Sequence, residues 1–415
     1  MTTGSNTYRI LHLMPWVVSG GVERRRLELA RGLQSDEFEQ HIVCIHSNDE
    51  MRAAFAEAGV TLVEIGGTWD VFDLKTILAL WKYAAAFKPD IIHGAVFEGM
   101  AMAAMVGRLY PSPTTFIEET SYATERSWRG DLLLHLLARA ATRCITVSHQ
   151  TRDLICERSR IPADKVTTIL NGVSAPTLPE EGSATSFRET YGIPEDAFLI
   201  GSVGRLRNEH KRFTDLIEAL AISRSKHPSL HLVIVGGGDD LGMLQAHAAA
   251  MGVQEHVTFT DYLFHVGPAY AAMDAFALSS RVESFGLVLV EAMYHRLPIV
   301  STRVGGTTQI VDEGETGFFA EPGSVSSIAE AIEQLLNLSP EEREAMGARG
   351  IQVANERFSS ERYVKDDAEL EAYLIGEGTT GETLILDDGT QIGSEDLRDR
   401  VRQAANFRSA LRRLA

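Results

Sequence analysis

Two glutamates with seven residues between them, Glu283 and Glu291, form the most specific chemical pattern in this sequence of 415 residues. They follow a predicted strand, and Phe285-Gly286-Leu287 is expected to open a helix whose free backbone N–H groups can hold a phosphate. Because eight helical residues span about 12 Å, the two carboxylates can reach opposite ends of a nucleotide sugar. Carboxylates are good acceptors for the vicinal hydroxyls of ribose or hexose. The alternative is a pair of glutamates on a helix surface.

A basic loop directly follows another predicted strand. It begins at Gly204 and contains Arg205 and Lys211, whose side chains are expected to converge on a diphosphate. Their charges would stabilise the negative charge of a leaving nucleoside diphosphate. The alternative is a basic surface loop, although the surrounding residues 176–375 hold −15 of the net charge of −18.

A glycine pair, Gly20-Gly21, lies between the first predicted strand and the first predicted helix. Such a turn can offer backbone N–H groups to a phosphate or a sugar hydroxyl, and it can also be no more than a tight turn. The three cysteines, Cys44, Cys144 and Cys156, lack the spacing of metal ligands. They predict reduced thiols in a cytoplasmic protein without a metal site.

Short apolar runs alternate with helical stretches along most of the chain, from the predicted strand at 10–14 onwards. This alternation predicts an α/β protein with parallel strands and covering helices. Turn-forming residues interrupt it at 174–187, where we expect a linker. The predicted first domain is 1–177, joined by a returning helix at about 361–375, and the second is 178–360. Residues 376–415 are expected to form a hairpin and a basic amphipathic helix.

The order of motifs resembles the retaining glycosyltransferases of family 4. The resemblance covers about residues 8–375, and its motifs are Gly20-Gly21-x-Glu23, Asn171-Gly172-Val173, Gly204-Arg205 with Lys211, Val235-Gly236-Gly237-Gly238, Glu283 with Glu291, and Gly305-Gly306. It implies the GT-B fold, in which two doubly wound Rossmann-like domains face each other across a cleft. It also implies transfer of a sugar from a nucleotide diphosphate sugar to an acceptor hydroxyl, with retention and by front-face substitution. The nucleotide sugar would be a co-substrate, without a tightly bound cofactor or a required metal.

The resemblance also assigns roles to individual residues. Arg205 and Lys211 would hold the diphosphate, Glu291 the ribose and Glu283 the transferred sugar. Backbone groups would complete the donor site, and Tyr262 and Leu263 would frame the base. Seven residues would complete the donor site through their backbone groups or lie next to the side chains named above: Gly20, Gly21, Gly204, Ser284, Phe285, Gly286 and Leu287.

The first domain departs from the family pattern. The family often carries a histidine six residues after a proline that opens a strand, whereas Pro113 here leads to Glu119. Glu119 is therefore expected to bind a sugar hydroxyl or to orient the acceptor. His93 is either an acceptor contact or a structural residue at a strand end. Arg24-Arg25-Arg26 is either a site for an anionic acceptor or headgroup, or a solvated helix face. Tyr122 is a candidate for stacking on a sugar.

Charge and hydropathy limit the partners. The excess of acidic residues argues against nucleic-acid binding, and no apolar run reaches the length of a membrane span. We expect a cytoplasmic protein, with peripheral contact at the inner face of the membrane and homo-oligomerisation through residues 376–415 as further possibilities. The expected acceptor is a glycan, a lipid-linked compound or a small molecule. Two alternatives stay open, a nucleotide-sugar epimerase of the same fold and a non-catalytic partner subunit.

Overall fold

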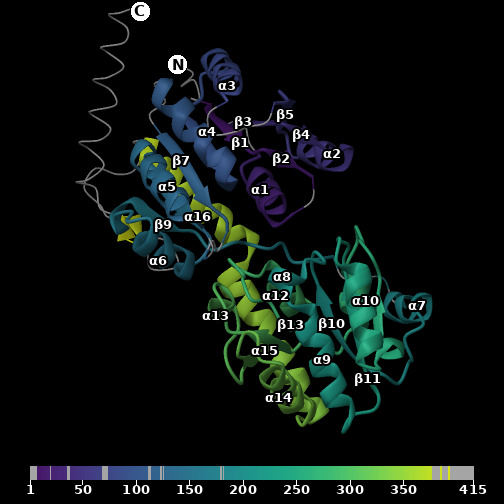
Figure 1. Ribbon diagram of the computed structural model, residues 1–415. Helices are drawn as coiled ribbons and strands as arrows, with labels where there is room; N and C mark the ends of the chain where they lie inside the picture. Colours follow the sequence, from purple (N-terminus) through teal and green to yellow (C-terminus); the bar gives the residue numbers. More distant parts are fainter. Residues whose placement is uncertain are drawn as a thin grey trace, which may run out of the picture. The chain divides into compact units, whose positions relative to one another are not determined.

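The computed structural model describes residues 7–18, 20–34, 38–67, 73–110, 114–121, 124, 126–177, 180, 182–375, 384–385 and 391–392. The described residues divide into two compact units. Unit 1 comes from Met1–Gly172 and Ser360–Ala415, and unit 2 from Val173–Ser359. Each unit contains a sheet of parallel strands with helices packed on it, which confirms the predicted doubly wound architecture (Figure 1).

The sheet of unit 1 has seven strands in the order β5-β3-β1-β6-β7-β8-β9. All of its neighbouring strands pair in parallel. The strands are β1 (Tyr8–Leu13), β3 (Phe38–Cys44), β5 (Thr61–Glu64), β6 (Ile91–Ala95), β7 (Thr114–Glu119), β8 (Arg143–Thr146) and β9 (Val166–Thr168). A short parallel pair joins β2 (Trp16–Val17) to β4 (His46–Ser47). The order reverses direction at β1, which is the point where doubly wound sheets bind ligands.

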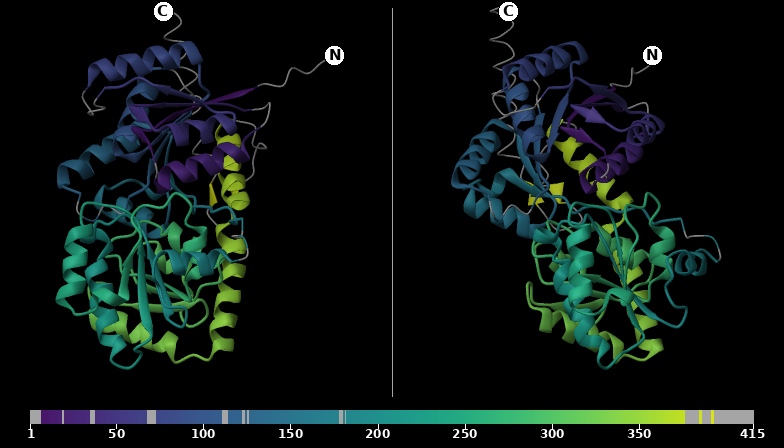
Figure 2. Two further views of the ribbon diagram at one scale, coloured as in Figure 1. Left: turned by 90° about the vertical axis from the view of Figure 1, so that its right-hand side faces the viewer. Right: turned by 45° about the vertical axis from the view of Figure 1, so that its right-hand side comes forward.

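Two layers of helices cover this sheet. Alternate residues of β1 face opposite layers, because Leu11 and Leu13 pack in one apolar cluster and Ile10 in another. The helices of unit 1 are α1 (Gly21–Gly32), α2 (Asp49–Glu57), α3 (Leu74–Phe87), α4 (Val96–Leu109), α5 (Trp128–Ala140), α6 (His149–Arg158) and α16 (Ser360–Ile375). Helix α4 packs between α3 and α5 on one face, while α1 packs against α16 on the other (Figure 2).

Unit 2 repeats the plan with six parallel strands in the order β12-β11-β10-β13-β14-β15. They are β10 (Phe198–Val203), β11 (Leu230–Val235), β12 (Val257–Phe259), β13 (Ala275–Leu278), β14 (Ile299–Thr302) and β15 (Gly317–Ala320). The helices are α7 (Ser183–Thr190), α8 (Asn208–Lys211), α9 (Phe213–Arg224), α10 (Leu241–Ala250), α11 (Gly267–Ala272), α12 (Leu287–Tyr294), α13 (Thr307–Ile310), α14 (Val325–Leu336) and α15 (Pro340–Phe358). Helix α9 packs against α10 and α14, and α12 against α15.

The expectation of a linker over 174–187 is wrong at its C-terminal end. Residues Ser183–Thr190 form α7, because the ring of Phe187 is buried and the helix packs against α11. Tertiary burial thus overrides the turn-forming composition of this segment.

The predicted hairpin in the last segment contains an antiparallel pair, β16 (Leu384–Ile385) and β17 (Gln391–Ile392). The predicted final helix lies outside the described residues. No helix in the described part of the chain is long and apolar enough to cross a membrane.

Candidate active site

The predicted donor-site residues of unit 2 lie in loops and helix starts that follow the carboxyl ends of its strands. Gly204, Arg205 and Lys211 follow β10, and Tyr262 and Leu263 follow β12. The segment from Glu283 to Glu291 follows β13. Because the strands are parallel, these loops emerge at one edge of the sheet, where ligands of such sheets bind.

An ion pair joins two of the predicted catalytic side chains. The ammonium group of Lys211 donates a hydrogen bond to the carboxylate of Glu283 at 2.6 Å. Both side chains are partly exposed, Lys211 to 21% and Glu283 to 14%, so a ligand can reach them. The hydroxyl of Ser279 donates to the carbonyl of Lys211 at 2.9 Å, and the N–H of Arg281 donates to the carbonyl of His210 at 2.7 Å. These bonds tie the loop after β13 to the loop after β10 and hold the ion pair in place.

The start of α12 adopts a backbone conformation that favours glycine. Gly286 has a φ of 110°, and a side chain at this position would be strained. A Cβ at Gly306 would lie 2.5 Å from the Cα of Phe285 and 2.6 Å from the carbonyl oxygen of Ser284. The ring of Phe285 is buried against Phe358. The buried side chain of Phe285 therefore anchors the turn. The first backbone N–H groups of α12 follow shortly after it in the chain, and N–H groups at a helix start can bind an anion.

A tyrosine that the sequence patterns missed holds the second glutamate. The hydroxyl of Tyr270, on α11, donates to the carboxylate of Glu291 at 2.8 Å. The ring of His295 stacks on Tyr270 with centroids 4.9 Å apart, and its Nδ1 lies 2.8 Å from the carbonyl oxygen of Glu291. Burial lowers the pKa of His295, so the neutral ring is favoured in this cluster. No sequence motif includes Tyr270, so only the structure shows this contact.

Two of the remaining predicted donor-site residues of unit 2 have exposed side chains. Arg205 is exposed, and its guanidinium forms no ion pair with another described residue. The ring of Tyr262 is 53% exposed and follows Asp261, whose carboxylate accepts a hydrogen bond from the Tyr262 N–H. The N–H of Leu206 donates to the carbonyl of Gly237 at 3.0 Å, so the triple-glycine turn braces the basic loop. Gly204 and Leu263 are partly buried.

Glu119 of unit 1 is buried and its two oxygens have protein partners. One oxygen accepts hydrogen bonds from the N–H and hydroxyl of Ser121, at 3.0 and 2.5 Å. The other pairs with the guanidinium of Arg126, which also lies over the ring of Phe97. The carboxylate is thus positioned at the end of β7 and tied to the segment that follows it.

The interpretation of Arg24-Arg25-Arg26 as a basic surface is wrong for two of its three members. Arg25 and Arg26 are buried and both pair with Glu118, Arg26 at 2.6 Å. Arg26 also lies 3.0–3.1 Å from the two ring nitrogens of His93. Both arginines occupy the face of α1 that packs against the sheet and α16, where the carboxylate of Glu118 compensates their burial.

His93 belongs to this buried cluster. It is only 1% exposed, and burial, followed by the nearby Arg26 charge, lowers its pKa well below the usual value. This favours the alternative of a structural strand-end residue over an acceptor contact.

The other first-unit candidates lie at the start of α1 or outside the described residues. Arg24 is exposed, Gly20 caps α1 without a side chain and Gly21 is its first residue. Tyr122 lies outside the described residues.

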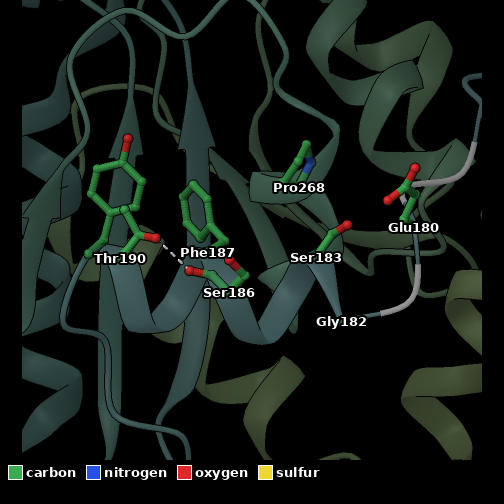
Figure 3. Close-up of a pocket in the computed structure, with 8 residues that line it drawn as sticks. Glu180, Gly182, Ser183, Ser186, Phe187, Thr190 and Pro268 are labelled. Atoms are coloured by element: carbon green, nitrogen blue, oxygen red, sulfur yellow. Dashed lines mark hydrogen bonds between the residues drawn. The ribbon is translucent and has the colours of Figure 1, made fainter.

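A surface groove in unit 2 is lined by other residues. Its volume is about 480 Å³, and it is lined by side chains of α7, including Ser183, Phe187 and Thr190, together with Glu180 and Pro268 (Figure 3). None of the predicted donor-site residues lines it. Among the described residues, no group of three or more His, Cys, Asp or Glu side chains could hold a metal ion.

Two family models match the chain in succession. Residues 20–172 match the model "Glycosyl transferase 4-like domain" and residues 183–353 match "Glycosyl transferases group 1". The chain is 31% identical over 180 residues to the N-acetyl-alpha-D-glucosaminyl L-malate synthase of Bacillus anthracis, a match that covers 43% of this chain and 46% of that protein. It is 25% identical over 346 residues to the putative glycosyltransferase EpsD of Bacillus subtilis, which covers 80% of this chain and 89% of that one.

The fold is also similar to a solved structure. Anabaena HepE, in a crystal structure with UDP and glucose, superposes with a TM-score of 0.79 at 19% sequence identity. The superposition covers 88% of this chain and 100% of HepE. This likeness concerns the fold and confirms the expected GT-B class.

Proposed function

Because the chain belongs to the family 4 glycosyltransferases of GT-B fold, we propose that it transfers a sugar from a nucleoside diphosphate sugar to an acceptor hydroxyl. One observation carries the proposal. Lys211 and Glu283, which are 72 residues apart in the sequence, form an ion pair at 2.6 Å in loops that follow the carboxyl ends of neighbouring strands. The ammonium group of Lys211 can bind a diphosphate, and the adjacent carboxylate of Glu283 can accept a hydrogen bond from a sugar hydroxyl. A nucleotide sugar carries both of these groups next to each other.

We propose that the donor diphosphate lies between Lys211, Arg205 and the start of α12. The bond between the anomeric carbon and the β-phosphate oxygen breaks, and the phosphate leaves with the bonding electrons. The positive charges of Lys211 and Arg205 stabilise the charge that develops on this oxygen. The N–H groups at the start of α12 add the partial positive charge of a helix N-terminus.

The acceptor oxygen then forms its bond to the anomeric carbon on the face that the phosphate leaves, so the anomeric configuration is retained. The proton of the acceptor hydroxyl passes to the departing phosphate oxygen. Glu283, which already accepts from Lys211, is proposed to bind a hydroxyl of the transferred sugar beside the anomeric carbon. The proposed step therefore needs no protein base, and it includes no resident cofactor or metal.

Glu291 is proposed to accept hydrogen bonds from the ribose hydroxyls. Tyr270 supports this role, since its hydroxyl donates a hydrogen bond to the carboxylate at 2.8 Å and thereby orients it. Tyr262 and Leu263 are proposed to frame the base. A uridine nucleotide is the first donor to test, because the similar fold of HepE was solved with UDP and glucose.

Unit 1 is proposed to bind the acceptor, with Glu119 and Arg126 at the end of β7 as its polar groups. The proposed product is a polysaccharide or another glycoconjugate. The names of the relatives support this class, since EpsD is a putative glycosyltransferase and the Bacillus anthracis protein is an N-acetyl-alpha-D-glucosaminyl L-malate synthase.

A thermal-shift screen of the purified chain against UDP, GDP, ADP, CDP and dTDP tests the donor site. A ligand at 100 times its Kd adds about 2.7 kcal/mol to the stability of the folded state, which a shift in Tm reports. We expect one nucleotide to stand out, with the same shift in magnesium and in EDTA. A shift that requires magnesium would contradict the metal-free proposal, and no shift with any nucleotide would favour a non-catalytic partner subunit.

Proton NMR of the reaction with the selected nucleotide sugar tests the transfer itself. The anomeric coupling constant of the first product formed is expected to match that of the donor. The opposite coupling would contradict retention. Conversion of the donor to an isomeric nucleotide sugar in the absence of any acceptor would favour the epimerase alternative.

A further inference from the structure

Three neighbouring helices of unit 1 expose an unusual number of large apolar side chains. Helices α3, α4 and α5 lie side by side on one face of the sheet (Figures 1 and 2). They carry seven of the thirteen large apolar side chains that are exposed in the described part of the chain: Leu74, Leu78, Trp81, Leu109, Trp128, Leu132 and Leu136. Single exposed apolar residues are normal on protein surfaces, but a cluster of this kind marks an interaction site. We call these residues, with the basic ones below, the α3–α5 face.

The exposed residues form a stripe along each of the two outer helices. In α5, Trp128, Leu132 and Leu136 are spaced by four residues, so they lie on one side of the helix. The opposite side of α5 is buried in the core through Leu134 and Leu137. Helix α3 has the same arrangement, with its exposed stripe at 74, 78 and 81 and its buried side at 77, 80 and 84. Each helix therefore has a second apolar side that the core of unit 1 does not use.

The exposed charges on these helices all have one sign. They are Lys75, Lys82, Arg108, Arg129 and Arg139. The acidic side chains of the three helices are Glu98, which is partly buried, and Asp131, which is buried and accepts a hydrogen bond from Arg158. This basic face stands out in a chain whose net charge is −18. Its partner is therefore expected to be negatively charged and apolar at once.

We propose that the α3–α5 face docks on the surface of an anionic lipid bilayer. Tryptophan and leucine side chains enter the boundary between headgroups and acyl chains, while Lys and Arg reach the anionic headgroups. A second copy of the chain is the less favourable occupant. A two-fold contact sets the face against itself, so the five cations would oppose five others. The inference does not depend on the proposed transfer reaction.

Co-sedimentation of the full chain with vesicles tests the surface. We expect binding to vesicles of phosphatidylcholine with phosphatidylglycerol, about ten-fold weaker binding to phosphatidylcholine alone, and a loss of binding at high salt. Leu132→Gln/Leu136→Gln is expected to lower the partition coefficient about five-fold or more. The matched control is Ile222→Gln/Met243→Gln, which changes two exposed apolar side chains of unit 2 and should bind like the wild type.

A charge test separates headgroup attraction from a general effect of net charge. Lys75→Glu/Lys82→Glu should weaken binding about ten-fold or more, because two side chains attracted to the anionic headgroups are replaced by two that are repelled. Lys226→Glu/Arg349→Glu makes the same change in net charge on unit 2, and its binding should stay close to that of the wild type. Equal losses in the two charge variants would overturn the assignment to the α3–α5 face. Circular dichroism and Tm of every variant exclude unfolding as the cause.

Fluorescence then distinguishes this face from the C-terminal segment. All four tryptophans lie within the first 128 residues, and residues 376–415 contain none. Lipids with brominated acyl chains should quench the tryptophan emission of the bound protein, and Trp81→Phe/Trp128→Phe should remove most of that quenching. Binding without quenching would overturn the proposal. A lipid-free dimer that Leu132→Gln/Leu136→Gln dissociates would overturn it in favour of a second copy.

Discussion

Replacing Lys211 by alanine should weaken the binding of the nucleoside diphosphate. A hydrogen bond between an ammonium group and a phosphate contributes about 1.5–3 kcal/mol. Lys211 must share or give up its ion pair with Glu283 to make this bond, and a partly exposed pair is worth about 0–1 kcal/mol. The net loss of about 0.5–3 kcal/mol corresponds to a Kd about 2–150 times higher. Isothermal titration calorimetry with the nucleotide chosen in the thermal screen measures it.

A matched pair on the same unit provides the control. Lys226 and Glu333 form an ion pair of the same length, 2.6 Å, on the surface of unit 2. Lys226→Ala removes the same charge and the same kind of contact, so it should leave the Kd unchanged. The reasoning fails if Lys211→Ala stays within about two-fold of the wild type.

A double variant separates two roles of Lys211. If the ammonium group contacts the diphosphate, Lys211→Ala/Glu283→Gln should bind the nucleotide as weakly as Lys211→Ala. If Lys211 only neutralises Glu283, removal of the carboxylate's charge should restore affinity in the double variant. That restoration would refute direct contact between Lys211 and the diphosphate.

Three further predictions concern other residues of the structure. Tyr270→Phe removes the hydrogen bond to Glu291, so we expect a Kd about 2–10 times higher in the same titration, and an unchanged Kd would exclude Tyr270 from positioning. Gly306→Ala should lower the Tm and weaken nucleotide binding, since its Cβ meets backbone atoms within 3 Å, whereas Gly242→Ala, in open space on α10, should raise the Tm slightly. His231 has its pKa lowered to about 4 by burial, so unfolding takes up a proton below about pH 6.5, where the unfolded histidine titrates. Its contribution to stability is present above that pH and should be lost progressively down to about pH 4, and His231→Gln should flatten this part of the dependence in urea titrations.

The architecture could be predicted because its signals are local. Alternating short apolar runs and helical stretches identify parallel strands and helices, because each pattern is contained within a few consecutive residues. Failures occurred where the deciding contact lies far away in the sequence. Composition predicted a linker at 183–187, but the burial of Phe187 against α11 makes that segment helical.

Some local signals were also overlooked. Helix α15 was not predicted, although Ser339 and Glu342 form a capping box with Pro340 at the first helical position. Such a pattern favours a helix start independently of tertiary structure.

The sequence by itself determined which residue types follow the strands, and thereby the chemistry of the candidate site. Gly204, Arg205, Glu283 and the glycine at 286 occupy loops whose position follows from the parallel strands, because the segment after each parallel strand begins at the carboxyl edge of the sheet. Likewise, the alternation of strands and helices predicted the doubly wound sheets, and its interruption near residue 174 predicted two domains.

Only the tertiary structure decided which of these groups meet. It pairs Lys211 with Glu283 and gives Glu291 a partner in Tyr270. It also buries Arg25 and Arg26 on the inner face of α1, where the sequence suggested a charged surface. Each of these contacts joins segments from different strands, and each depends on how helices pack on the sheet. Sequence spacing defines the face of one helix or strand, whereas contact between elements depends on the packing of the whole unit.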